Sequence, residues 1–353
     1  MTDLSATPPV PSAQRRETIG AVAALLFAVV AGALVTYKAS SALKAISRAR
    51  QAHTLAPKAE MFARAGLPSW ARPVAGTANY FLWVMVALGF GIVLGALVRA
   101  LFPDRWLART VGAGGRRGLF LAAAAGTPLM LCSCCVAPLF DGVYARTRRL
   151  GPSLAMMLAA PALNPAALVL TFLLFPLRLA GWRIGLSIVL VLGVSAGVGA
   201  LARDTAAPLA CLVGANDRAA GGIARAIGRA LREIAGRSLP AILLGVVLSA
   251  MLMEVVPLSS LGATHGGWAL LTLAVAAIAV PLAMPTFGEI PIALGLLAAG
   301  APQGAALAML IAGPAINLPS LLTLRRAVST RAAVALAAAV FLVAGAGGLM
   351  VGR

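Results

Sequence analysis

The stretch Gly126-Thr-Pro-Leu-Met-Leu-Cys-Ser-Cys-Cys-Val-Ala-Pro138 decides the fold. It interrupts an apolar run that starts near Leu119, and its two prolines, Pro128 and Pro138, predict breaks in regular helix. A broken helix leaves backbone N–H and C=O groups unpaired, which a bilayer tolerates only where the break is buried in protein or lines a cavity. The stretch therefore predicts a helical membrane protein with an internal site at this break.

The composition of the whole chain points the same way. Of 353 residues, 61% are hydrophobic and 11% are charged, and the mean hydropathy is +0.95. Soluble domains have about 45–50% apolar and about 25% charged residues. A chain with so few polar groups cannot cover the surface of a soluble fold, which excludes a cytosolic enzyme, a disulfide-stapled secreted domain and a disordered protein. We expect an all-α polytopic membrane protein.

The formal net charge is +19, and the Arg and Lys residues lie in short loops between apolar runs. Positive charges in such loops stay out of the bilayer and set the orientation of a membrane protein. We therefore expect the lipid bilayer as the surroundings of the chain and no nucleic acid as a partner.

The two halves of the chain repeat each other at an offset of 153 residues. Shared membrane composition explains Ala and Leu identities, but it does not explain Pro, Gly and Asn coincidences in one ungapped register. Pro-interrupted apolar segments at matching positions of two halves are the sequence sign of a transporter binding site near the bilayer midplane. At this offset, six pairs of residues match: Pro128 with Pro281, Pro138 with Pro291, Gly142 with Gly295, Gly151 with Gly304, Pro161 with Pro314, and Asn164 with Asn317. The six prolines among them are the predicted helix breaks.

Loop charge distinguishes parallel from inverted repeats. If every segment spans, basic loops fall on both sides of the membrane. If 118–146 and 268–300 are re-entrant hairpins, most basic loops share the cytoplasm, although the basic stretch 38–76 then faces out. This favours inverted repeats with Pro-broken or re-entrant helices, about 7–9 membrane segments in all.

The apolar runs divide the chain into four regions. The first run, Ile19 to Tyr37, is longer than the apolar core of a signal peptide and predicts an uncleaved transmembrane helix. The basic connector carries Ile and Leu on one helical face and Arg on the other, which predicts an amphipathic helix at the membrane surface. The regions are 1–78, with the N-terminal tail, first helix and basic loop; 79–203, repeat 1; 204–238, the connector; and 239–353, repeat 2 with the last transmembrane helix.

Three of the four cysteines, Cys132, Cys134 and Cys135, fall within four residues at the break. Cysteine is also a small apolar residue at home in a bilayer, but three in one window between prolines favour a functional thiol cluster. Pro138 is expected early in the next half-helix, whose N-terminal dipole would stabilise thiolates. Thiolates are soft ligands for trivalent arsenic, mercury or monovalent copper. We expect Cys132 and Cys134 to bind a soft metal or metalloid as substrate, and we expect no cofactor.

Four polar residues are further candidates. Glu289 stands in repeat 2 at the position that matches the thiols in repeat 1. A carboxyl group in a membrane segment costs free energy, so it indicates a function such as proton coupling or cation binding. A structural hydrogen bond is the alternative. Asp141 is a second coupling candidate that can instead pair with Arg146 or Arg148. Asn164 and Asn317 can bind a substrate or cap half-helices.

These residues carry a resemblance to a known family. The stretch from Gly126 to Pro138, with Gly151-Pro-Ser-Leu-Ala-Met-Met-Leu-Ala-Ala-Pro161-Ala-Leu-Asn-Pro165 and Gly-Pro-Ala-Ile-Asn at 313–317, resembles the bacterial predicted-permease family that includes YraQ and the ArsP-type methylarsenite efflux permeases. The resemblance covers about 79–331, and Cys-Ser-Cys followed by Pro is its specific part. It implies a multi-pass protein of the bacterial inner (plasma) membrane. It also implies that Cys132, Cys134 and Cys135 bind trivalent arsenic.

The sequence thus predicts a permease, a secondary transporter and not an enzyme, that exports a small soft solute such as a trivalent organoarsenical. No Gly-x-x-x-x-Gly-Lys-Ser/Thr motif for nucleotide hydrolysis occurs. A membrane thiol-disulfide redox protein is one alternative, because Cys132 and Cys135 have Cys-x-x-Cys spacing. A channel or scaffold subunit is another. A homo-oligomer is left open.

Overall fold

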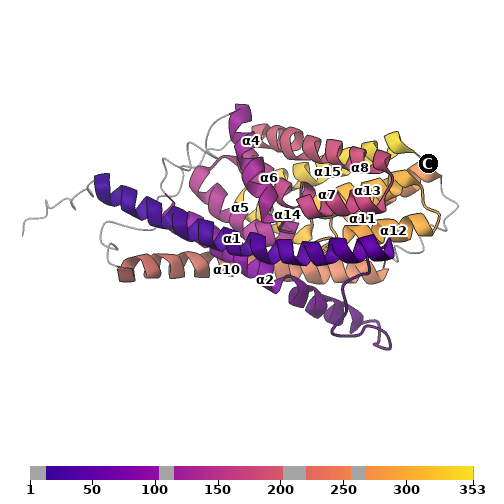
Figure 1. Ribbon diagram of the computed structural model, residues 1–353, viewed down its shortest axis with the longest axis horizontal. Coiled ribbons are helices and arrows are strands. Elements are labelled where there is room, and N and C mark those ends of the chain that lie inside the picture. Colours follow the sequence, from indigo (N-terminus) through magenta and orange to yellow (C-terminus); the bar gives the residue numbers. More distant parts are fainter. Residues whose placement is uncertain (1–12, 103–114, 202–219, 256–266, 353) are drawn as a thin grey trace, which may run out of the picture.

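The computed structural model describes residues 13–102, 115–201, 220–255 and 267–352, and helices are its only regular secondary structure over these ranges (Figure 1). Cys211 and residues 204–219 of the predicted connector lie outside the described residues. The elements are α1 (Ala13–Ala52), α2 (Arg72–Leu101), α4 (Gly115–Gly126), η1 (Thr127–Leu129), α5 (Ser133–Thr147), α6 (Leu150–Ala162), α7 (Pro165–Leu174), α8 (Leu177–Ile188), η2 (Val189–Val194), α9 (Ser195–Leu201), α10 (Ala220–Val255), α11 (Trp268–Ala279), α12 (Glu289–Ala298), α13 (Gln303–Ala315), α14 (Leu318–Ala327) and α15 (Thr330–Val351).

The described helices include five that are long and apolar enough to cross a membrane. Two bent pairs raise this to seven if each pair is one span: α6 with α7, bent by 40°, and α13 with α14, bent by 43°. Both bends directly follow a predicted proline break, at Pro161 and at Pro314. The all-helical membrane architecture agrees with the prediction from composition, while the total of 7–9 segments stays a prediction.

Two long helices differ from the sequence-based expectation. α1 continues to Ala52 instead of ending near Tyr37. The segment after Tyr37 is rich in Ala, Lys, Arg and Ser and contains no Gly or Pro, so helix propagates through it. α10 passes through Pro240 without a break, although the connector was expected to end at 238. An interior proline removes one backbone hydrogen bond, which membrane helices tolerate where neighbouring groups compensate.

Glycines bring α2 and α5 into direct backbone contact. A Cβ atom on Gly95 would collide with the carbonyl group of Pro138, and one on Gly142 would collide with Gly95. Small residues of this kind let membrane helices approach closely where no hydrophobic force drives them together. The contact fixes α5, and with it the cysteines at its start, against α2.

The helix bounds themselves recur at the offset seen in the sequence. α4, α6 and α7 coincide with α11, α13 and α14 when 153 residues are added to both ends of each helix. α4 packs on α6, and α11 packs on α13. The two sets of helices are therefore alike in length, order and neighbours.

The two sets run in opposite directions through the molecule. The start of α6 adjoins the end of α9, because a Cβ atom on Gly199 would lie 2.6 Å from the Cα of Gly151. The start of α13 adjoins the end of α15, where the N–H of Gly304 donates to the Gly352 carbonyl at 3.0 Å. Arg178, at the start of α8, donates to the carbonyl of Val351, the last residue of α15, at 3.3 Å. Because the start of α8 meets the end of α15, α8–η2–α9 and α15 are antiparallel. It follows that α6 and α13 begin at opposite ends of the bundle, as Figure 1 shows.

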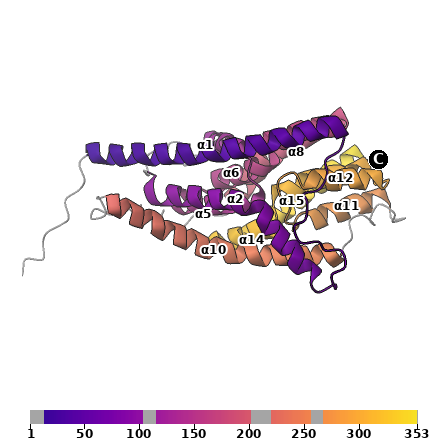
Figure 2. The same cartoon turned by 60° about the horizontal axis from the view of Figure 1, so that its bottom comes forward.

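α1 lies along the outside of this bundle (Figure 2). Most of its apolar segment is exposed within the single chain, and it packs against α2, α7 and η1. This position places α1 beside the first helix break.

Candidate functional site

The thiol cluster forms where the chain reverses between η1 and α5. Met130 adopts a left-handed backbone conformation with φ 49°, which is uncommon for a residue with a side chain. Cys132 is extended and is the N-cap of α5, so Cys134 and Cys135 stand in the first turn. Pro138 lies inside α5 instead of near its start. The helix N-terminus expected near Pro138 therefore lies at the cysteines themselves.

The three sulfur atoms converge on one point. The Sγ atoms of Cys132 and Cys134 are 3.3 Å apart, those of Cys134 and Cys135 are 3.7 Å apart, and all three lie within 4.8 Å of one another. The three thiols are free and buried. A soft ion binds a thiolate at about 2.3 Å, so these spacings suit one shared ion or metalloid atom after small adjustments. The Tyr80 hydroxyl lies 2.9 Å from the Cys134 sulfur and fixes that side chain from α2.

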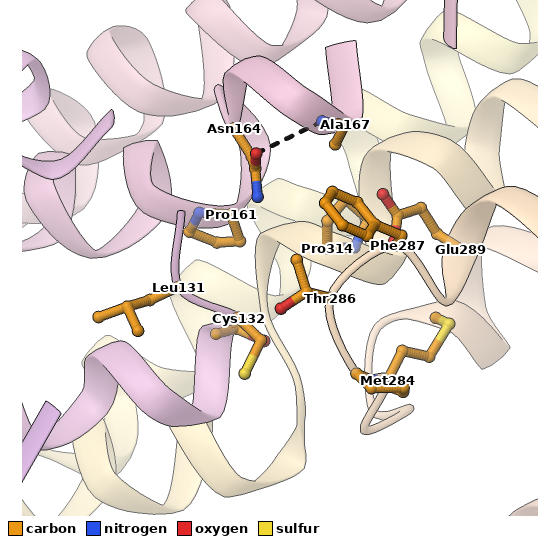
Figure 3. A pocket seen from close by; sticks show the side chains of 12 residues that line it. Leu131, Cys132, Pro161, Asn164, Ala167, Met284, Thr286, Phe287, Glu289 and Pro314 are labelled. Atoms are coloured by element: carbon orange, nitrogen blue, oxygen red, sulfur yellow. Dashed lines mark hydrogen bonds between the residues drawn. The ribbon is translucent and has the colours of Figure 1, made fainter. Parts of the chain in front are cut away.

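Cys132 lines a small pocket of about 20 Å³, the size of one water molecule, between the helix breaks of both halves (Figure 3). The first half contributes the break after η1 and the α6–α7 bend. The second half contributes the break before α12 and the α13–α14 bend. The lining residues are Leu131, Cys132, Ser133, Pro161, Asn164, Ala167, Met284, Pro285, Thr286, Phe287, Glu289 and Pro314. Breaks distant in sequence thus meet at one cavity, which is where broken membrane helices are tolerated.

Glu289 lines this pocket and is held by a buried ion pair. Its Oε1 accepts from Arg183 Nη2 at 2.8 Å, and Arg183 Nη1 donates to the Thr171 hydroxyl at 2.6 Å. Arg183 is completely buried, and Glu289 is the first residue of α12, where the helix dipole favours a negative charge. The pair connects α8 of the first half to α12 of the second.

The two asparagines both cap helices. Asn164 Oδ1 accepts from the N–H groups of Ala166 and Ala167, at 3.1 and 3.4 Å, while its amide nitrogen points away from α7 towards the pocket (Figure 3). Asn317 forms a capping box with Ser320 at the start of α14, and its Nδ2 atom has no partner among the described residues. Asn317 does not line the pocket. Asn164 is thus the asparagine placed to contact a pocket occupant directly.

Asp141 lies outside the pocket, further along α5. It is buried, and its Oδ2 atom has no hydrogen-bond partner among the described residues. Arg237, Arg99 and Arg148 lie within electrostatic reach of it. Arg146, one of its two expected partners, donates instead to the Phe102 carbonyl at 2.6 Å.

The remaining predicted breaks take different positions. Pro128 lies in η1, and Pro281 follows the end of α11. Pro291 is the third residue of α12, in the first turn, where a missing N–H group costs least. The chain therefore turns between Pro281 and Glu289, with Phe287 in a left-handed conformation at φ 72°.

Three residues that contact this site are not among the sequence-based candidates: Arg183, Tyr80 and Lys38. Arg183 lies in α8 and Tyr80 in α2, both far in sequence from the residues that they contact. Lys38 was assigned to a basic loop, whereas its Nζ donates to the Thr286 hydroxyl at 3.0 Å from within α1. The signal for Lys38 was the uninterrupted helix-forming composition around it.

Comparison with known proteins matches this chain to a family. The ArsP_1 family model, described as a predicted permease, matches residues 70–353. The chain belongs to the predicted-permease family. This permease is 32% identical over 312 residues to the UPF0718 protein YraQ of Escherichia coli (strain K12), with 88% of each chain covered. It is 35% identical over 65 residues to the UPF0718 protein MJ0584 of Methanocaldococcus jannaschii, and the match covers 18% of this chain and 16% of that protein. No solved structure matches the permease significantly.

Family membership confirms the predicted resemblance and supports a membrane permease. The match begins at residue 70, so α1 and the loop after it lie outside the family model.

Proposed function

We propose that this permease is a secondary transporter that exports a small, soft, thiol-reactive solute, with a trivalent organoarsenical as the representative substrate. The observation that supports this proposal is the convergence of three thiols, whose sulfur atoms lie within 4.8 Å of one another, at a pocket lined by the helix breaks of both halves. Each S–As bond that forms replaces an As–O bond, and the hydroxyl group leaves as water with the thiol proton. No change of oxidation state is required, so the binding is reversible and suits transport.

Glu289 and Arg183 are the proposed coupling pair. A proton that reaches Glu289 from the pocket would cancel its charge and break the 2.8 Å contact between α12 and α8. Because the pair links the two halves of the molecule, its opening and closing can follow the occupancy of the pocket. Asp141, buried among arginines at another level of α5, is the proposed second proton-carrying group.

Proton-driven flux tests the transport function. Full-length permease in proteoliposomes should accumulate a monomethylated trivalent arsenical when a proton gradient is imposed, and a protonophore should abolish the accumulation. Empty liposomes are the control. Flux that ignores the gradient would favour a channel. Dithiol-disulfide exchange without flux would favour the redox alternative, for which the 3.3 Å separation of the Cys132 and Cys134 sulfurs is the supporting observation.

We further propose that the two halves are inverted repeats and that their hairpins, α4–α5 and α11–α12, are re-entrant. The matching helix bounds and the opposite directions of α6 and α13 support this. The first turns of α4 lie beside the start of α6, because a Cβ atom on Gly151 would contact Leu119 at 3.5 Å. Arg116 and Arg148 are therefore expected on one side of the membrane.

Single-cysteine labelling tests this topology on a background without native cysteines. Arg116→Cys and Arg148→Cys should react with an impermeant maleimide from the same side. Ala299→Cys, an exposed position between α12 and α13, should react from the other side. Labelling of Arg116→Cys and Arg148→Cys from opposite sides would contradict the re-entrant hairpin.

A further inference from the structure

Lys38 is an ionisable residue inside a membrane-length helix. It directly follows the apolar run that ends at Tyr37, within the candidate span Ala21–Ala52 of α1, and a lysine in a membrane segment is costly unless a polar partner receives it. Its ammonium group donates to the Thr286 hydroxyl at 3.0 Å and forms no ion pair with any described carboxylate. The lysine is therefore turned into the protein, and its charge is not neutralised there.

The partner of Lys38 belongs to the pocket. Thr286 lines the pocket together with Cys132 and lies between Cys132 and Phe287 in Figure 3. Lys38 shares one face of α1 with Val35, Ala39 and Ala42, at helical spacings of three and four residues. Ala42 forms a small buried cluster with Met130 and Ala166, and Val35, Ala39 and Phe287 pack against it. α1 thus covers the breaks of both halves and presents Lys38 to the rim of the pocket.

A second cation approaches from the loop after α1. The Asn79 side chain accepts from the N–H groups of Met61 and Phe62, at 3.0 and 2.9 Å, and Trp83 Nε1 donates to the Ala59 carbonyl at 3.0 Å. These bonds hold the loop against α2 on either side of Tyr80, the residue that contacts Cys134. Lys58, next to the anchored segment, thereby comes within electrostatic reach of Lys38, Cys132 and Cys135.

Two charges of the same sign near one pocket oppose each other. Lys58 is exposed as a whole residue. Desolvation of its ammonium group by the surrounding protein and the charge of Lys38 both lower the pKa of Lys58. Glu289, the carboxylate that lines the pocket, is already engaged by Arg183. The surroundings of the pocket therefore combine soft thiols with the positive charges of Lys38, at the Thr286 hydroxyl, and of Lys58.

We propose that the pocket takes an anionic substrate, a small solute whose soft atom binds the thiols while its carboxylate, sulfonate or comparable oxyanion group binds Lys38 and Lys58. This inference rests on the proposed thiol-binding function and narrows its substrate class. Lys38 and Lys58 both precede residue 70, so the family model does not cover them. They are the proposed specificity residues of this chain.

A matched pair of probes tests the proposal on the purified full-length chain. Phenylarsine oxide is neutral, and 4-carboxyphenylarsine oxide carries the same trivalent arsenic with one added carboxylate. The wild-type chain should bind the carboxylate probe about tenfold more tightly, a typical effect of one charged hydrogen bond. Lys38→Met should remove that preference, because its loss of affinity should be about tenfold larger for the carboxylate probe than for phenylarsine oxide. Lys44→Met, an exposed lysine on the same helix, is the matched control and should change neither affinity.

The outcomes separate this inference from the function on which it rests. If the wild type binds both probes equally, the preference for an anion is wrong and the thiol site stands. Equal losses for both probes in Lys38→Met would show that the lysine serves the thiolates, which also overturns the inference. Lys38→Arg keeps the charge, and retention of the carboxylate preference in this variant supports it even if Lys38→Met folds poorly. Binding of neither probe by the wild type would overturn the thiol site itself.

Discussion

Replacing Cys132 or Cys134 by serine should abolish binding and transport of a trivalent organoarsenical. The two sulfurs are 3.3 Å apart, and Cys132 also lines the pocket. A monomethylated trivalent arsenical has two exchangeable valences, so two thiolates satisfy it. Serine is a hard ligand that stays protonated at neutral pH, so each change should lower the affinity by more than about 100-fold. Equilibrium binding and proteoliposome flux measure the two effects.

Cys135 distinguishes two classes of substrate. Its sulfur lies 3.7 Å from that of Cys134 and is completely buried. Cys135→Ser should be mild for a two-valence arsenical and severe for inorganic arsenite, which has three valences to satisfy. Cys211→Ser is the matched control, because it removes a thiol outside the cluster. Full transport by the triple serine variant would show that the cluster only packs, and recognition would then rest on Asn164 and Glu289, the other polar candidates that line the pocket.

The sequence was informative wherever the signal was local. Proline positions predicted the breaks at η1 and at the α6–α7 and α13–α14 bends, because proline acts on its own helix. Three cysteines in four residues predicted a cluster, since neighbours around a break cannot lie far apart. The Pro, Gly and Asn register predicts an internal repeat, which stays a prediction; the bounds of α4, α6 and α7 recur in α11, α13 and α14 at the same offset.

The contacts between distant segments could not be predicted. Arg183 and Glu289 are 106 residues apart, and Lys38 and Thr286 are 248 apart, so no pattern in either neighbourhood names the partner. The uninterrupted course of α10 through Pro240 has the same origin, because tertiary packing around a proline decides whether a helix breaks. The positions of Lys38 and Lys58 near the thiols depend on where α1 packs, and a single sequence does not reveal that packing.

Glu289→Gln should abolish proton-dependent flux while the protein remains inserted in the membrane. Glutamine keeps the size of the side chain but cannot carry the proton that opens and closes the contact with Arg183. The substitution also leaves Arg183, which is fully buried, without its 2.8 Å counter-charge. Breaking one side of a buried pair costs about 3–5 kcal/mol of stability, so the variant should also unfold at lower temperature in detergent.

The double variant Arg183→Gln/Glu289→Gln separates coupling from stability. It removes both charges and leaves two amides that can bond to each other and to Thr171, which donates and accepts through one hydroxyl. Removing both members of a buried pair is far less costly than removing one, so thermal stability should return towards the wild-type value. Proton-dependent flux should stay absent, because no titratable carboxyl faces Cys132 across the pocket. If either variant instead keeps wild-type flux over about pH 6 to 8, a range in which buried carboxyl groups titrate, Glu289 is a structural tie between α8 and α12. The coupling proton would then have to travel through Asp141, whose buried Oδ2 has no hydrogen-bond partner among the described residues.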